Sequence, residues 1–316
     1  MAAHDDTRID NVIETTRSKP IPPRLSVHTS KLITTGVDIE TDTPTDDDLT
    51  YMHSIMCQVG FPRKAVFGDE FERVCGNAAL GIDAGRLWNG KAFVRQPIPF
   101  GPWPRLIMAY LNTAALRSQS PDIEVGASAS EFIRMLGKQH GGGPRGGYTS
   151  FRKQMLALSA CQLTLGFTLG DKAITYNGSP VYRFEAWLSN TGHQRTLWPG
   201  AITLSQEYFD TLKQHAVPLD LRALNALSGS ALAMDAYAML SQRLRRIEGR
   251  PVKLHWKNLQ AQFGQDYTGK NAAKDFKRTF KIALQQALVV YPQAKVKLVT
   301  GGVLLMASPP PIPEKL

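Results

Sequence analysis

The strongest constraint on the fold is a succession of helical and strand patterns that occurs twice along the 316 residues. Each copy contains an amphipathic helix, a shorter helix ending at a glycine, a third helix with a basic triplet, and alternating apolar residues. The matched positions are Tyr110 with Tyr237 and Gly137 with Gly264, both 127 apart, and Phe151-Arg152-Lys153 with Phe276-Lys277-Arg278, 125 apart. Three such matches in the same order indicate a duplicated structural unit.

The first copy is expected to contain three helices and a β-hairpin. The helices are predicted over residues 102–118, 128–136 and 149–160. Ser128 is a suitable N-cap for the second helix, and Gly137 is expected to end it. Apolar residues then alternate from Leu163 to Leu169, and the turn signals Gly170-Asp171 and Asn177-Gly178 predict the hairpin.

The second copy repeats this order near the C-terminus. Its helices are predicted over residues 230–247, 256–263 and 270–290. Gly264 is expected to end the second helix, and the segment from Lys295 to Ala307 is expected to form a hairpin that turns at Gly301-Gly302.

Three helices followed by a β-hairpin is the order of a winged helix, so the sequence predicts an α+β fold with two tandem winged-helix domains. The first domain is expected over residues 51–192, with an N-terminal β-hairpin extension, and the second over residues 193–307. Residues 1–50, rich in Thr, Asp and Pro, are predicted to be a disordered acidic segment. Residues 308–316 form a Pro-rich tail.

Positive charge is concentrated in the second copy. The chain has a net charge of +10, although residues 1–50 contain ten acidic and five basic residues. Residues 242–297 contain thirteen Lys or Arg and three Asp or Glu. Such a surface binds a polyphosphate because binding releases condensed counterions. The alternatives are a basic surface that only meets solvent and, less consistent with the core-forming periodicity, an anionic membrane.

The third helix of the second copy carries the sharpest local signal. Its cations recur at spacings that gather them on one side: Lys270, Lys274, Lys277, Arg278 and Lys281. Its apolar residues form an opposing stripe: Phe276, Phe280, Leu284, Leu288 and Tyr291. Asn271 is placed to read an adenine edge. Further DNA-binding candidates from the loop, second helix and hairpin are Lys253, Lys257, Lys295 and Lys297.

The first copy offers a thinner basic surface. Arg152 and Lys153 lie on its third helix, and Arg145 lies in the preceding glycine-rich loop. These residues are candidates for DNA phosphate contacts, and self-association of the chain is an equally open interpretation.

No catalytic, cofactor-binding or metal-binding pattern is found. The seven His residues have none of the spacings of metal sites, and Cys57, Cys75 and Cys161 are far apart. The loop Gly141–Gly147 lacks the Lys-Ser/Thr ending of a phosphate-binding loop. No apolar run reaches the roughly 20 residues of a membrane span, and scattered thiols suit a reducing compartment. We therefore expect a cytoplasmic, non-enzymatic protein without cofactor, metal or membrane partner.

Two segments resemble plasmid-encoded RepA replication initiators: residues 56–64, MCQVGFPRK, and residues 102–111, PWPRLIMAYL. The glycine loop before residues 151–155 adds to the likeness, which extends over residues 51–307 and is looser after Trp198. Phe61 stands where Leu is expected. The resemblance implies an initiator that binds double-stranded DNA at repeated origin sites, opens the adjacent duplex, and recruits the host initiator and replicative helicase. It also implies homodimers that repress their own gene and monomers that initiate.

Two other functions stay open. A dedicated winged-helix transcriptional repressor would share the fold and the basic surface. A DNA-nicking enzyme is a further alternative, although the sequence lacks the His pattern of a nicking site.

Overall fold

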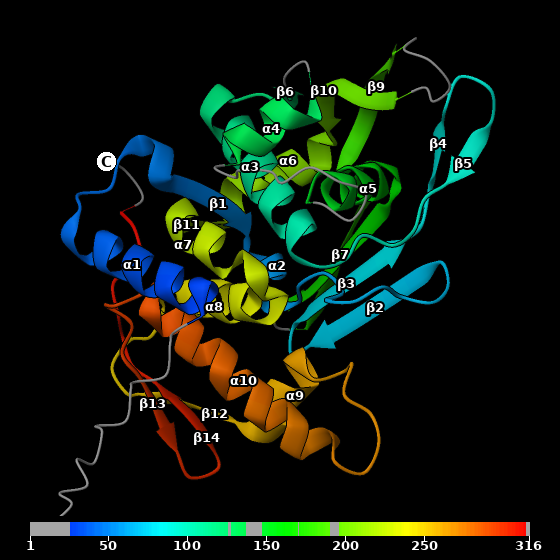
Figure 1. Cartoon of the computed structure of the whole chain (residues 1–316). Helices are drawn as coiled ribbons and strands as arrows, with labels where there is room; N and C mark the ends of the chain where they lie inside the picture. Colours follow the sequence, from blue (N-terminus) through cyan, green and yellow to red (C-terminus); the bar gives the residue numbers. More distant parts are fainter. Residues whose placement is uncertain (1–25, 126–127, 137–146, 170, 190–195, 314–316) are drawn as a thin grey trace, which may run out of the picture.

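The computed structural model describes residues 26–125, 128–136, 147–169, 171–189 and 196–313 (Figure 1). Helices and strands are interspersed along the described chain, which confirms the predicted α+β class. Figure 1 shows two groups of helices, each with a small sheet, at opposite ends of the molecule. The two groups correspond to the two copies of the sequence pattern, and a set of central elements joins them.

The second unit follows the predicted order closely. Its elements are α8 (Ala231–Leu244), β12 (Val252–His255), α9 (Trp256–Phe263), α10 (Ala272–Val289), β13 (Val296–Val299) and β14 (Gly302–Leu305). The strands pair antiparallel in the order β12-β14-β13. Gly264 caps α9, as predicted, and Gly301 adopts a φ of +84° in the turn between β13 and β14. A residue with a side chain would be strained at that turn.

The first unit repeats this order. Its elements are α3 (Pro102–Ser118), β6 (Asp122–Glu124), α4 (Ala129–Met135), α5 (Gly147–Ala160), β9 (Val181–Ser189) and β10 (Thr196–Leu204). The strand order β6-β10-β9 matches β12-β14-β13 of the second unit. The hydroxyl of Ser128 accepts a hydrogen bond from the Glu131 amide, which confirms the predicted N-cap of α4. Gly137 and Gly170 lie outside the described residues.

The hairpin predicted after α5 exists, but it belongs to another sheet. Strands β7 (Gln162–Leu169) and β8 (Lys172–Gly178) extend the hairpin β2 (Glu70–Cys75) and β3 (Ala78–Asp83) in the order β2-β3-β7-β8. The strands that occupy the position of β13 and β14 are β9 and β10. The prediction failed here because alternation identifies a strand without identifying its partner. A separate hairpin, β4 (Arg86–Trp88) and β5 (Phe93–Arg95), projects from the first unit.

Residues 26–50 are folded, so the prediction of disorder was wrong for this part of the chain. They form α1 (Val27–Thr41), the short helix η1 (Asp46–Asp48) and the start of β1 (Leu49–His53). Leu32, Gly36 and Ile39 share one side of α1, and Leu32 and Ile39 are buried. Among the described side chains of α1, only two large apolar residues hold the helix to the body, since Ile33 and Val37 are exposed, and so few buried residues leave little signal in a polar composition. Residues 1–25 lie outside the described chain.

Central elements join the two units, and they contradict the predicted boundary at residue 193. These elements are α2 (Ser54–Gln58), α6 (Gln206–His215), β11 (Ala216–Asp220), α7 (Leu221–Ala226) and η2 (Leu227–Gly229). Strand β10 lies beyond residue 193 yet pairs with β9 and β6, because its sheet belongs to the first unit. Strand β11 pairs with β1, far away in the sequence.

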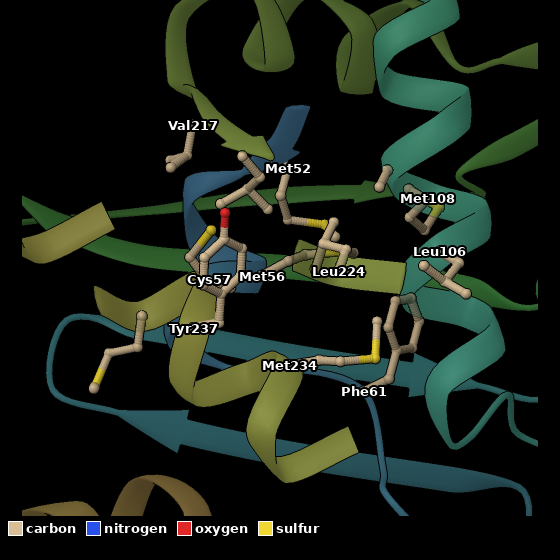
Figure 2. Packing of buried hydrophobic residues seen from close by; sticks show 14 of the residues in the cluster. Met52, Met56, Cys57, Phe61, Leu106, Met108, Val217, Leu224, Met234 and Tyr237 are labelled. Carbon is tan, nitrogen blue, oxygen red and sulfur yellow. The ribbon is translucent and has the colours of Figure 1, made fainter. Parts of the chain in front are cut away.

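One hydrophobic core runs through the described chain. Figure 2 shows its centre, where Met56 and Phe61 from the N-terminal segment pack among residues of α3 and α8, including Leu106 and Tyr237. The Pro-rich tail also packs on the body, since the Tyr291 hydroxyl donates to the Pro309 carbonyl at 2.6 Å and Ile312 is buried. The second unit is therefore held against the first by shared apolar packing.

Candidate nucleic-acid interface

Helix α10 has the two faces that its sequence predicts. The residues that it buries are Phe276, Phe280, Ala283, Leu284 and Ala287. Phe280 contacts the Phe263 ring of α9 and the Trp256 ring at centroid distances of 5.5 and 6.3 Å. The helix begins at Ala272, so Lys270 and Asn271 precede it instead of forming its first turn. Asn271 occupies the N-cap position without a side-chain capping bond, and its side chain is exposed.

The cations of α10 lie on its open face. Lys274, Lys277 and Arg278 are exposed, and Lys281 is half-buried. Arg278 forms an ion pair with Asp275 at 3.2 Å, one turn earlier, which partly neutralises it. The Lys277 ammonium lies 5.2 Å from the centroid of the Trp256 ring. A cation above an indole is attracted by the ring quadrupole, so this contact fixes the position of Lys277.

The small sheet beside α10 presents a second row of cations. Lys253 of β12 and Lys297 of β13 both lie opposite Leu304 of β14, so the three side chains share one face. The other face buries Leu254 and Val303 against the helices. Lys295, just before β13, is exposed, as is Lys257 in the first turn of α9.

Helix, sheet and turn converge at the start of α9. The Trp256 amide donates to the Gly301 carbonyl at 3.1 Å, which ties the β13–β14 turn to α9. The Lys253 ammonium lies beside Gly301, 3.5 Å from where a Cβ would stand. Because Lys277 lies over the Trp256 ring, cations from α10 and from the sheet are brought to one place. Lys277 thus lies over the Trp256 ring, and Lys253 lies beside the turn that is bonded to the Trp256 amide.

Trp256 was not among the predicted site residues. Its position beside Lys257 at the start of a helix is visible in the sequence. Nothing local indicates that its ring lies under a lysine 21 positions later, since that contact depends on how α9 and α10 pack.

The candidate residues of the first unit are less exposed. Arg152 of α5 is half-buried, and its Nε is buried without a hydrogen-bond partner among the described residues. Lys153 is exposed. Arg145 lies outside the described residues. The structure therefore leaves Lys153 as the described member of this set that is open to a ligand.

Polar contacts orient the second unit relative to the N-terminal segment. Arg63 donates to the Phe263 carbonyl at 2.5 Å and to Asp266 at 2.7 Å, at the end of α9. Gln262 donates to the Gln58 carbonyl at 2.7 Å. Arg73 lies nearby, and burial lowers the pKa of its guanidinium. Arg63 lies in the segment that resembles RepA initiators, and this role was not predicted from the sequence.

Two further properties concern only the described chain. No group of three or more His, Cys, Asp or Glu side chains there is arranged to hold a metal ion. Within the same residues, no helix combines the length and apolarity needed to cross a bilayer.

A family model described as plasmid encoded RepA protein matches residues 98–256, half of the 316-residue chain. Among solved structures, the crystal structure of domain 2 and domain 3 of RctB is similar, with 11% sequence identity and a TM-score of 0.48. That similarity covers 79% of this chain and 93% of the other. Comparison with curated proteins finds no match.

Proposed function

The chain belongs to the family of plasmid-encoded RepA proteins, and we propose that it initiates plasmid replication by binding duplex DNA at repeated sites of the origin. The observation that carries this proposal is the convergence of Lys277, Lys253 and the Gly301 turn around Trp256. The family match ends at Trp256, so the role given to α10 depends on this geometry and on the charge of the segment.

Each unit is proposed to be a winged helix. In the second unit, α10 is the recognition helix and the β13–β14 hairpin is the wing. A B-DNA major groove is about 12 Å wide and admits one helix. With its apolar side buried, α10 would present Lys274, Lys277 and Arg278 to the groove, while Asn271 at its N-terminus reaches a base edge. The wing lysines Lys253 and Lys297 would contact the phosphate backbone.

The first unit is proposed to supply backbone contacts through Lys153 and the surface of a homodimer. Opening of the adjacent duplex and recruitment of the host initiator and replicative helicase belong to the same proposal, as does repression of the chain's own gene by its dimer. What supports this part of the proposal is the family to which the chain belongs, and none of these proposed activities needs a catalytic residue.

The DNA-binding part is tested by replacing Lys274, Lys277 and Lys281 together with Ala. Fluorescence anisotropy would follow binding to DNA from the region flanking the gene at several salt concentrations. The logarithm of affinity falls with the logarithm of salt by about 0.9 for each phosphate contacted. Loss of three contacts should therefore flatten the slope by about 2.7 and weaken binding strongly at low salt.

The matched control replaces Arg134 of α4, Lys172 of β8 and Lys213 of α6 with Ala, because these three cations are exposed and belong to elements outside the second unit. It removes the same charge and should change the slope only slightly. Equal slopes in the two triple variants would contradict the assignment of α10 as the DNA-binding helix.

Two assays separate the initiator from the alternatives. An origin plasmid that depends on this chain should be maintained by an initiator, whereas a dedicated repressor would not maintain it. Metal-dependent nicking of supercoiled DNA is expected to be absent, and its presence would favour a nicking enzyme.

A further inference from the structure

The β4–β5 hairpin is a second surface that the duplex interface does not use. Its strands pair Arg86 with Arg95, Leu87 with Val94, and Trp88 with Phe93. Residues that lie opposite each other in an antiparallel pair share a face, and alternate residues along a strand do too. One face therefore carries both arginines and both aromatic rings. Figure 1 shows the hairpin projecting from the first unit, far from β13 and β14.

The aromatic face is open to solvent. Trp88 is 55% exposed and Phe93 68%, with ring centroids 5.2 Å apart. The opposite face is partly covered, since Leu87 is buried and its partner Val94 is 41% exposed. Contiguous apolar surface that is exposed to solvent is a feature of interaction sites, and the two adjacent rings provide such a surface.

The tip of the hairpin is ordered by its turn. The Asn89 side-chain oxygen accepts hydrogen bonds from the Lys91 and Ala92 amides at 2.9 and 2.8 Å. Gly90 has a φ of +89°, which a side chain would strain. The rings are thus held in place before any ligand binds, which lowers the entropic cost of binding.

The hairpin is also cationic. Arg86, Lys91 and Arg95 are exposed, and residues 84–105 contain no Asp or Glu. Arg95 forms an ion pair with Asp69 at 2.5 Å, whereas Arg86, on the same face, has no ion pair within the described part of the chain. A ligand of this face must combine flat apolar groups with negative charge.

We infer that the β4–β5 hairpin binds single-stranded DNA, with unpaired bases stacked on Trp88 and Phe93 and phosphates held by Arg86 and Arg95. Single strands offer unstacked bases and a charged backbone together. A duplex keeps its base faces stacked inside, so the rings would have no equivalent partner. A second copy of the chain, joined symmetrically at this face, would bring Arg86 and Arg95 against themselves. The inference goes beyond the proposed duplex interface and concerns a different surface.

The test compares the full chain with its Trp88→Ala/Phe93→Ala variant in binding to a fluorescent oligo-dT of about 20 nucleotides, longer than a typical single-strand site. Stacking one base on an aromatic side chain changes affinity by a factor of roughly 5 to 150. The double variant should therefore bind oligo-dT at least about 25-fold more weakly. Trp88→Phe should retain most of the affinity, because a phenyl ring still stacks.

Two variants, each expected to weaken binding of one DNA form and not of the other, make the result specific. The hairpin variant should keep its affinity for duplex DNA flanking the gene, and the α10 triple-lysine variant should keep most of its affinity for oligo-dT. Val74→Ala, at an exposed apolar residue of β2, serves as the control outside the hairpin and should change neither. Replacing Arg86 and Arg95 with Gln should flatten the salt slope for oligo-dT by up to about 1.4.

Failure of the hairpin inference can be distinguished from failure of the α10 proposal. Unchanged oligo-dT binding in the Trp88→Ala/Phe93→Ala variant overturns the inference, even if duplex binding by α10 holds. A change in sedimentation mass without a change in oligo-dT affinity would show that the hairpin joins two copies instead, and it also overturns the inference. Unchanged duplex affinity and salt slope in the α10 triple-lysine variant would refute the proposed function of that helix and leave the hairpin result standing.

Discussion

The ion pair between Arg105 and Asp235 joins the first helix of each unit. The two side chains are 4% and 6% exposed, and the guanidinium donates to both carboxylate oxygens at 2.6 and 2.8 Å. It also donates to the carbonyls of Gly101 and Phe61 at 2.6 and 2.7 Å. A buried charge with complete hydrogen bonds is tolerated, whereas removing one partner leaves the other charge uncompensated.

Asp235→Ala is therefore expected to lower the free energy of unfolding by about 3–5 kcal/mol in urea titrations. The control is Lys213→Ala, which breaks the exposed pair with Asp210 and should change the free energy of unfolding only slightly, because solvent screens that pair. Replacing Arg105 with Met and Asp235 with Leu together should recover much of the loss, because no charge is left buried. Equal losses of unfolding free energy in Asp235→Ala and Lys213→Ala would show that the buried ion pair contributes no more to stability than the exposed one.

His53 couples stability to pH. Its ring is fully buried, and its Nδ1 accepts a hydrogen bond from the Ile55 amide at 3.2 Å, at the start of α2. Burial, assisted by the neighbouring His215, lowers the pKa of His53 to about 3. The unfolded chain has a His pKa near 6.5, so between these values the unfolded state holds a proton that the folded state does not.

The stability that His53 contributes is fully present above about pH 6.5 and is lost as the pH falls toward 3. From pH 7 to pH 5, the loss from this residue should be about 2 kcal/mol. His53→Asn keeps an oxygen that can accept the Ile55 hydrogen bond but does not titrate. Urea unfolding at the two pH values should therefore show a smaller decrease for the variant, and equal decreases would contradict the shift.

At the scale of elements, local signals were predictable and strand partners were not. Helix α9 was predicted to its ends because Gly264 and the apolar period are both local. The alternation in β7 showed which face is apolar, but its pairing with β3 depends on a hairpin 80 residues earlier. The Asn89-Gly90 turn of the β4–β5 hairpin is a strong local signal that the sequence analysis overlooked.

The candidate site also has features that were predictable from local sequence and features that were not. The buried and cationic faces of α10 follow from residue spacing alone, so Lys274, Lys277 and Phe280 were placed correctly. Lys270 was assigned to a helix that begins two residues later, since helix ends depend on capping contacts. The contact between Lys277 and Trp256 depends on tertiary packing and could not be predicted from the sequence.

Docking of α1 is predicted to depend on Leu32. This residue is 5% exposed, whereas its neighbour Ile33 is 42% exposed. Leu32→Ala removes buried methyl groups and should cost about 2–5 kcal/mol of local stability, so amide hydrogen exchange across α1 should accelerate. Ile33→Ala should leave exchange in α1 nearly unchanged, because most of its side chain already meets water. Unchanged protection in both variants would mean that Leu32 does not hold the helix.

For the whole molecule, the central question is whether the two units can move independently. The core is continuous, and Arg63 bonds the N-terminal segment to the Phe263 carbonyl and Asp266 at the end of α9. Gln262 adds a bond to the Gln58 carbonyl. Such contacts hold α9 against the N-terminal segment, so the proposed DNA-binding surface of α10 would keep a set position relative to the first unit when both meet DNA.

A fixed geometry predicts that the described core unfolds as one cooperative unit. Trp103 packs on Phe151 in the first unit, and Trp256 packs on Phe280 in the second. Two variants, each keeping one of these tryptophans as its only fluorophore, should give coincident urea curves that also match far-ultraviolet circular dichroism. Arg63→Ala should weaken the junction and separate the two midpoints, with the Trp256 curve moving to lower urea. Separate midpoints without that substitution would show that the units are independent, and the bonds of Arg63 would then be too weak to set their spacing.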